Sequence, residues 1–209
     1  MSVCDMTVLA TSATVITMLT GMARWQSGSR ERLATAALRL FASQGFEGTT
    51  VAQIAAEAGL TERTFFRYYS DKPEVLFAGQ EVFEGLFLEG LAATASTRPI
   101  ELVAATLDHA AGFFPDERRP WSRSRQDVIN SNSALQEREQ HKMSGLADSL
   151  TSAIVGRGID PIGAALAAEA TVSVFRRSFA AWIAAGEDRS FVDIQRDVLR
   201  QLQALLAHS

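Results

Sequence analysis

The chain contains little cysteine, proline or glycine, and each shortage excludes a class of protein. Its single cysteine, Cys4, excludes an internal disulfide framework and any zinc site built from several cysteines. With 14 glycines and 5 prolines among 209 residues, the composition is that of neither collagen nor a flexible linker. The net charge of -4 and the hydrophobic share of 47% exclude a disordered chain. The sequence is therefore that of a globular protein with one large domain or two small ones.

Motifs of the common enzyme classes are missing as well. There is no Gly-x-Ser-x-Gly elbow, phosphate-binding loop, dinucleotide fingerprint or histidine-rich metal motif. Gly156-Arg157-Gly158 has neither the preceding strand nor the spacing of a nucleotide site. His109 and His141 have no companion metal ligands at usable spacing. We therefore expect no enzyme activity, no cofactor and no bound metal.

The start of the chain contains a run without charge, residues 6–23, between Asp5 and Arg24. A secretory signal would need basic residues before this run. A membrane span would need about 20 mostly apolar residues, whereas six of these eighteen are Thr or Ser. We interpret residues 1–23 as a leader outside the fold. Translation from Met22 is a further hypothesis, which the intact mass of native protein would test. No later run is apolar enough for a bilayer, so we expect a cytoplasmic protein without membrane contact.

From Arg30 onward, apolar residues recur at helical spacing. Five of them, at i, i+3, i+4, i+7 and i+8, predict one buried helical face: Leu33, Ala36, Ala37, Leu40 and Phe41. Glycines at 45 and 48 end this helix. A second, short helix follows Thr50, which with Gln53 forms a capping-box pattern. After Gly59, Thr61 can cap a third helix over residues 62–69.

Six further helices are predicted from spacing together with start and stop signals. Asp71, Asn132 and Asp160 are suitable caps, and each stands before a segment with helical periodicity. The predicted helices cover about residues 71–95, 100–114, 121–130, 134–155, 161–185 and 191–207. We find no alternating strand pattern and no internal repeat. The predicted fold class is therefore all-α, with about nine helices.

The first three helices have the spacing of a helix-turn-helix, in which the third helix can lie in the major groove of DNA. This spacing alone is only moderately specific, because many helical bundles contain a glycine between short helices. The local sequence is more specific: Leu40-Phe41 ends the first helix, Gly45-Phe46 forms the turn, and TTVAQIAAEAGLTERTFFRYYSDKPEVLF follows over residues 49–77. These motifs closely resemble the DNA-binding domain of TetR-family transcriptional repressors.

The resemblance covers residues 30–78 in detail, and beyond them only helix number and lengths agree. It implies a DNA-binding domain over residues 24–78, and a helical ligand-binding and dimerisation domain over residues 79–209. It also implies a homodimeric repressor that binds an inverted-repeat operator in double-stranded DNA. A small, mostly apolar effector would enter the second domain and shift the fourth helix, which would change the separation of the two DNA-binding heads.

Three polar residues at the start of the third helix can reach base edges. Arg63 suits guanine O6 and N7, and Thr64 suits a thymine methyl or a phosphate. Glu62 can accept from a cytosine amine, or it can complement the positive end of the helix.

In the TetR family, residues at four positions commonly contact the DNA phosphates. The resemblance places Thr50, Phe66, Tyr68 and Lys72 at those positions. Phe66 stands where the family usually has Tyr, and Arg67 can compensate as an extra cation. Simple aromatic packing remains the alternative for Phe66 and Tyr68. The expected DNA-binding residues are Thr50, Thr61, Glu62, Arg63, Thr64, Phe66, Arg67, Tyr68 and Lys72.

The second domain offers candidates for a dimer interface and for a ligand pocket. Apolar residues of the last two helices form the predicted interface, unless they are buried within one chain: Leu166, Ala170, Val174, Ala181, Val198, Leu202 and Leu205. Polar or aromatic residues are candidates to line the pocket, and each could instead be structural: His109, Trp121, Arg125, Gln126, Asn130, His141, Arg176 and Trp182.

Three other functions remain as alternatives. The helix-turn-helix could be scaffold in a helical interaction module, or the protein could be an activator. An enzyme is the third alternative, which the missing motifs disfavour.

Overall fold

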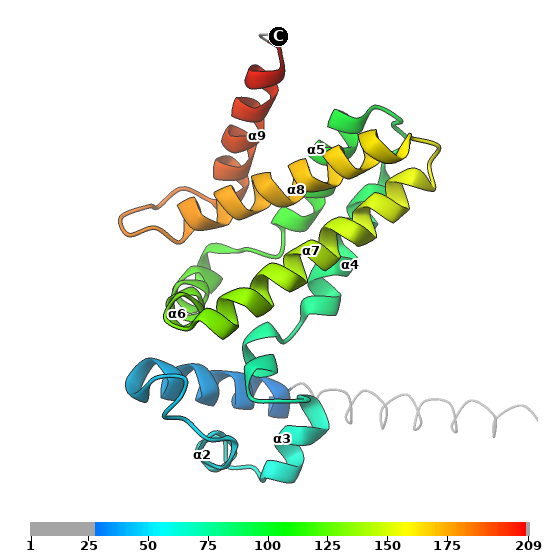
Figure 1. Ribbon diagram of the computed structural model, residues 1–209. Coiled ribbons are helices and arrows are strands. Elements are labelled where there is room, and N and C mark those ends of the chain that lie inside the picture. The colour runs from blue at the N-terminus through cyan, green and yellow to red at the C-terminus, as the bar shows by residue number, and fades with distance from the viewer. Residues whose placement is uncertain (1–27, 208–209) are drawn as a thin grey trace, which may run out of the picture. The chain divides into compact units, whose positions relative to one another are not determined.

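The computed structural model describes residues 28–207, and every regular element in that range is a helix (Figure 1). The predicted all-α fold is confirmed. The chain divides into two compact units, Met1–Ala78 and Gly79–Ser209. The expected leader, residues 1–23, and the alternative start at Met22 lie outside the described residues. Within residues 28–207, no helix has the length and apolarity to cross a membrane.

The N-terminal unit contains a helix over residues 28–44, then α2 (Val51–Glu57), α3 (Glu62–Tyr68) and the short 3-10 helix η1 (Pro73–Phe77). The predicted caps are confirmed. The Thr50 side chain accepts from the backbone N–H of Gln53 at 3.2 Å, and the Gln53 side chain accepts from the N–H of Thr50 at 2.8 Å. Thr61 accepts from the N–H of Thr64 at 3.2 Å. These bonds fix where both short helices begin.

The continuous helix predicted over residues 71–95 is wrong, because the structure has two helices there. The 3-10 helix η1 ends at Phe77, and α4 (Gln80–Ala93) begins after Gly79. Gly79 has φ +88°, a left-handed conformation that ends a right-handed helix and that glycine adopts without strain. Asp71 does cap the first piece, where it accepts from the N–H of Glu74 at 2.8 Å.

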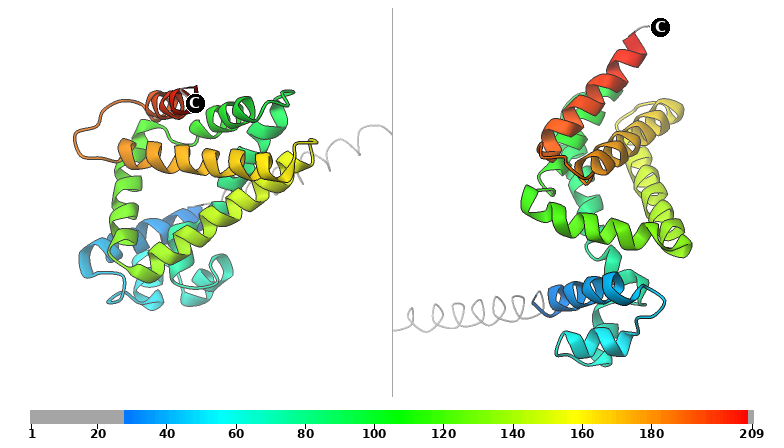
Figure 2. Two further views of the ribbon diagram at one scale, coloured as in Figure 1. Left: turned by 45° about the horizontal axis from the view of Figure 1, so that its top comes forward. Right: turned by 90° about the vertical axis from the view of Figure 1, so that its left-hand side faces the viewer.

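The C-terminal unit continues with α5 (Pro99–Ala111), η2 (Asp116–Arg118), α6 (Arg119–Asn130), α7 (Ser133–Val155), α8 (Pro161–Trp182) and α9 (Phe191–Ala207). The predicted caps Asn132 and Asp160 are confirmed by bonds from the N–H groups of Leu135 and Gly163. Helices α7 and α8 pack as an antiparallel pair, α5 and α9 pack on α8, and α4 packs on α5 (Figure 2). The C-terminal part of α9 extends beyond α8 (Figure 1).

An aromatic core joins α4, α8, α9 and the segment directly after α5. We use this name for Phe83, Phe87, Phe113, Phe114, Phe175, Phe179, Trp182 and Phe191, whose rings form one chain of contacts. Phe114 is central, with its ring centroid 4.6 Å from that of Phe191 and 5.8 Å from that of Trp182. Tilted and edge-to-face pairs of this kind stabilise a core beyond the apolar area they bury.

Three arginines donate to backbone carbonyls of segments far away in the sequence, and we call them the arginine clamps. Arg119 donates to the carbonyls of Glu187 and Arg189. Arg123 donates to those of Ile183 (2.7 Å) and Ala184 (2.9 Å), after α8. Arg157 donates to Leu91 O (2.8 Å) and Thr94 O at the end of α4. Arg123 and Arg157 thereby satisfy carbonyls that a helix end leaves without partners. Arg119 instead holds carbonyls of the loop between α8 and α9.

Helices α4 and α5 approach each other closely at Gly90. A Cβ at this position would lie 2.6 Å from the Cβ of His109 and 3.1 Å from the Cα of Thr106. We therefore expect Gly90→Ala to force the helices apart and to lower the free energy of unfolding by about 1–3 kcal/mol. Urea unfolding measures the effect.

Gly85→Ala is the matched control, in the same helix. A Cβ at Gly85 would meet nothing within 4 Å. This change should stabilise the protein by about 0.5–1 kcal/mol, because alanine favours helix more than glycine does. Equal effects of the two substitutions would contradict the close crossing at Gly90.

Candidate DNA-binding surface

Helix α3 has one buried side and one exposed side. Phe65 is fully buried and Tyr69 is 2% exposed, so the prediction that both face the core is confirmed. The Tyr69 hydroxyl donates to the carbonyl of Arg30 at 3.0 Å, and burial raises the pKa of this phenol. These two anchors fix the rotation of α3, and Arg63 and Phe66 consequently lie on its exposed side.

The exposed side carries both charged and apolar groups. Glu62, Arg63 and Arg67 are exposed, and the Phe66 ring is 54% exposed although it packs edge-on against Phe65 at 5.5 Å. A solvent-exposed aromatic ring whose orientation is fixed by a buried neighbour is available for contact with another molecule. The sequence could not distinguish this position from simple packing, and the structure places Phe66 outside the core.

Arg67 and Tyr68 form a joint donor group. The Arg67 guanidinium donates to the Tyr68 hydroxyl oxygen at 3.1 Å and lies 4.9 Å from the centre of its ring. The Tyr68 O–H proton remains able to donate outward, as do the other guanidinium N–H groups. The pair can therefore hold an anion such as a phosphate between two donors of known position.

Lys72 has a structural role that its sequence position did not reveal. Its ammonium donates to the carbonyls of Phe46 (2.8 Å) and Thr49 (2.9 Å), and it lies 4.1 Å from the centre of the Phe46 ring. These contacts hold the loop that leads into Thr50 and α2. One of the three N–H groups of the ammonium is left for a further acceptor.

We expect Lys72→Met to lower the free energy of unfolding by about 1–3 kcal/mol, because two carbonyls lose a charged donor. Chemical denaturation of the purified protein measures this loss. Arg63→Met is the control: it also removes a cation, but from an exposed position, and should leave stability nearly unchanged. If Lys72→Met unfolds at the denaturant concentration of the unchanged protein, the ammonium does not hold the loop.

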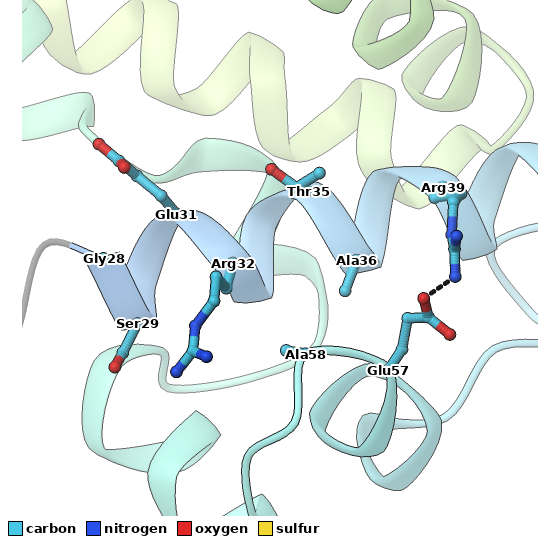
Figure 3. Close-up of a pocket in the computed structure, with 9 residues that line it drawn as sticks. All are labelled: Gly28, Ser29, Glu31, Arg32, Thr35, Ala36, Arg39, Glu57 and Ala58. Carbon is cyan, nitrogen blue, oxygen red and sulfur yellow. Dashed lines mark ion pairs between the residues drawn. The ribbon is translucent and has the colours of Figure 1, made fainter.

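An open pocket of about 720 Å³ lies between the first helix and the end of α2 (Figure 3). Arg39 and Glu57 form an ion pair across it. Arg32 also lines it and has no ion-pair partner among the described residues. This pocket could not be predicted from the sequence, because only the crossing of two helices brings Arg39 and Glu57 together.

The expected ligand-pocket residues lie in three different settings. Trp182 is fully buried in the aromatic core. Four of the residues lie on α6. There the side-chain amide of Gln126 donates a hydrogen bond to the side-chain oxygen of Asn130 at 3.1 Å, and both Arg125 and Gln126 donate to the carboxylate of Glu139 of α7. The α6 residues are Trp121, Arg125, Gln126 and Asn130. His109, His141 and Arg176 are exposed on other helices.

The expected interface residues differ in exposure. Leu166 and Leu205 are 67% and 73% exposed in the single chain. Val174 is buried within the chain. The rest pack partly against the core: Ala170, Ala181, Val198 and Leu202. Ile162, 74% exposed and one turn before Leu166, was missed by the sequence analysis.

No group of three or more His, Cys, Asp or Glu side chains in residues 28–207 is arranged to hold a metal ion.

Comparisons with known proteins agree on the N-terminal unit. Residues 33–78 match the family model for bacterial regulatory proteins of the tetR family. The HTH-type transcriptional regulator TcmR of Streptomyces glaucescens is 34% identical over 89 residues, 42% of this chain and 39% of that protein. HbdR of Aromatoleum sp. (strain CIB) is 40% identical over 48 residues, 23% and 21% of the two chains. The chain thus spans about two fifths or less of these curated relatives.

Solved structures extend the likeness to the whole fold. FadR of Bacillus subtilis, a transcriptional regulator in complex with stearoyl-CoA, matches with a TM-score of 0.55 at 18% identity, over 82% of this chain and 96% of that one. A transcriptional regulator of Rhodococcus sp. Rha1 gives 0.52 at 18% identity, over 86% and 96%. At such identities the likeness concerns the fold alone. The matched helix-turn-helix and the likeness in fold together support a TetR-family transcriptional regulator.

Proposed function

We propose that this protein is a ligand-responsive repressor that binds an inverted-repeat DNA operator as a homodimer. The observation that carries the proposal is the exposed side of α3, where Arg63, Phe66 and Arg67 stand over the buried anchors Phe65 and Tyr69. A short helix with a fixed rotation and exposed polar and apolar groups is suited to reading base edges in the major groove.

Base reading would fall to the first turn of α3 and to Phe66. Arg63 would bind guanine in bidentate geometry, and Glu62 would accept from a cytosine amine. Phe66 has no hydroxyl for a phosphate, and its exposed ring suits a thymine methyl group.

Contacts with the DNA phosphates, which position the protein on the duplex, would come from hydrogen-bond donors around this helix. Tyr68 and Arg67 act as one pair, Lys72 offers its remaining N–H, and Thr50 and Thr61 stand at the starts of α2 and α3. Thr64 already contacts the Thr61 hydroxyl at 3.0 Å, so the two hydroxyls would bind a phosphate together.

A homodimer follows from the limits of a single head, which reads only a few base pairs. Ile162 and Leu166 of α8 and Leu205 of α9 are exposed apolar side chains on the two last helices. An interface between two copies would remove them from water.

The effector would bind in the C-terminal unit. FadR of Bacillus subtilis, a structural neighbour, was solved with stearoyl-CoA, a ligand with a long apolar chain and a charged head. The expectation of a mostly apolar effector agrees with that example. Such a ligand weakens DNA binding only if it binds the non-binding conformation of the dimer more tightly.

Selection of bound duplexes from a random DNA pool, at moderate salt, tests the proposal. An enriched inverted repeat would support a dimeric, sequence-specific regulator. A folded protein that enriches nothing, even after refolding to strip ligands, would favour the interaction module instead. Transcription from the selected site, with and without the protein, distinguishes a repressor from an activator.

Arg63→Ala should make the free energy of binding to the selected operator less favourable by about 1–3 kcal/mol. It should also relax the choice of base at one position of each half-site. Fluorescence anisotropy with single-base operator variants measures both effects. Arg98→Ala is the matched control, because it removes an exposed arginine of the C-terminal unit. A uniform loss on every sequence would assign Arg63 to the phosphates.

A further inference from the structure

Arg118, directly before α6, lies on two aromatic rings and lacks an acidic partner. Its guanidinium carbon is 4.0 Å from the centre of the Phe113 ring and 5.4 Å from that of Trp121. Within the described residues, no carboxylate pairs with this guanidinium, although it is half-buried. The nearby Asp116 pairs instead with Arg119, at 2.7 Å.

A second arginine, Arg125 of α6, is close enough to act electrostatically on Arg118. The Arg125 side chain is only 16% exposed, and it bonds to Glu139 of α7 at 3.1 Å. Gln126 donates to the other oxygen of Glu139 at 2.9 Å. Glu139 therefore offsets the charge of Arg125, and Arg118 is left as a charge that no described carboxylate offsets.

The electrostatics at Arg118 are unfavourable for a lone cation. Burial lowers the pKa of its guanidinium, and the positive charge of Arg125 lowers it further. A half-desolvated cation beside a like charge is costly unless an anion joins it. The two rings and the half-buried Arg118 guanidinium together suit a ligand with an apolar body and a negative head.

We propose that Arg118, beside Arg125, binds the anionic head of a small ligand whose apolar or aromatic body lies against Phe113 and Trp121. The ligand class is a carboxylate, sulfonate or phosphate ester on an apolar body. The planar guanidinium fork matches two oxygens of such a head. That this ligand is the effector rests on the proposed function, whereas the binding site itself does not.

Two fluorescent probes with the same aromatic body test the site. 8-Anilinonaphthalene-1-sulfonate carries the anion, and N-phenyl-1-naphthylamine is its uncharged counterpart. The full-length protein should bind the sulfonate, and Arg118→Gln should weaken that binding about tenfold, as expected for loss of one charge-assisted contact. Binding of the uncharged probe should change less than twofold, and Arg118→Lys should restore part of the sulfonate affinity.

Arg98→Gln is the matched control, because this exposed arginine lies at the start of α5 and already pairs with Glu101. It should leave the affinity for both probes unchanged. The proposal is overturned if the protein does not bind the sulfonate, if both arginine variants weaken it equally, or if Arg118→Gln weakens both probes alike. Far-ultraviolet circular dichroism verifies that each variant is folded.

The sulfonate titration and the operator selection fail independently. If the protein selects an operator but its probe binding does not depend on charge, the proposed anion site is wrong and the proposed function is unaffected. If probe binding depends on charge but no operator is selected, the proposed function is wrong and the proposed anion site is supported. If both succeed, loss of operator affinity on adding the sulfonate, diminished in Arg118→Gln, identifies the anion site as the effector site.

Discussion

Trp182→Ala should lower the free energy of unfolding by about 3–5 kcal/mol, the range for removal of a large aromatic side chain from a packed core. The indole is fully buried, with its ring centroid 5.8 Å from that of Phe114 and 5.7 Å from that of Phe191. Its N–H also donates to Asp116 at 3.3 Å. Alanine would leave a cavity among rings that are fixed by several neighbours and cannot collapse into it.

Guanidinium chloride unfolding, followed by circular dichroism, measures this loss. Trp182→Phe should cost less, about 1–3 kcal/mol, because it keeps a ring and loses the hydrogen bond. Trp121→Ala is the control for residue type, since Trp121 lies half-exposed outside the aromatic core. A cost below about 1 kcal/mol for Trp182→Ala would mean that the indole lines a space rather than fills the core.

Leu166→Glu should convert the proposed dimer to a monomer and weaken operator binding at least about 100-fold, because two linked heads bind with the avidity that one head lacks. The side chain is 67% exposed in the single chain, so its replacement should not disturb the fold of one protomer. In a two-fold interface each protomer would contribute one new carboxylate, and the two negative charges would repel each other.

Sedimentation velocity and operator titration measure the two effects. Leu205→Glu, on α9, should act in the same way, because its side chain is 73% exposed on the other helix of the proposed interface. Val82→Glu is the matched control: this valine of α4 is 61% exposed, outside the proposed interface. A Leu166→Glu protein that sediments as a dimer would place the interface elsewhere.

Signals confined to a few residues predicted local structure well. The caps Thr50, Thr61, Asn132 and Asp160 depend on a side chain and an N–H group three residues away, and all four are confirmed. The break at Gly79 was missed, because the apolar periodicity continues across it and one glycine does not by itself end a helix.

Features that depend on distant parts of the chain were not predicted. Lys72 and Phe46 are 26 positions apart, and Arg119 and Glu187 are 68 apart. Nothing near either basic residue indicates which carbonyl it meets. Trp182 was ambiguous for the same reason, since the sequence does not show which rings surround it. The exposed side of α3, by contrast, could be inferred from helical periodicity once Phe65 and Tyr69 were placed in the core.

The arginine clamps determine how firmly α6 is attached. This helix contributes no side chain to the aromatic core that joins its neighbours, within the described residues. It packs on α7, and hydrogen bonds from Arg123 and Arg119 fasten it to the end of α8 and to the loop that follows α8. Water can replace such bonds, whereas it cannot replace a packed ring. Backbone amides of α6 should therefore exchange with deuterium before those of α5 and α8, as a local opening that leaves the rest of the unit folded.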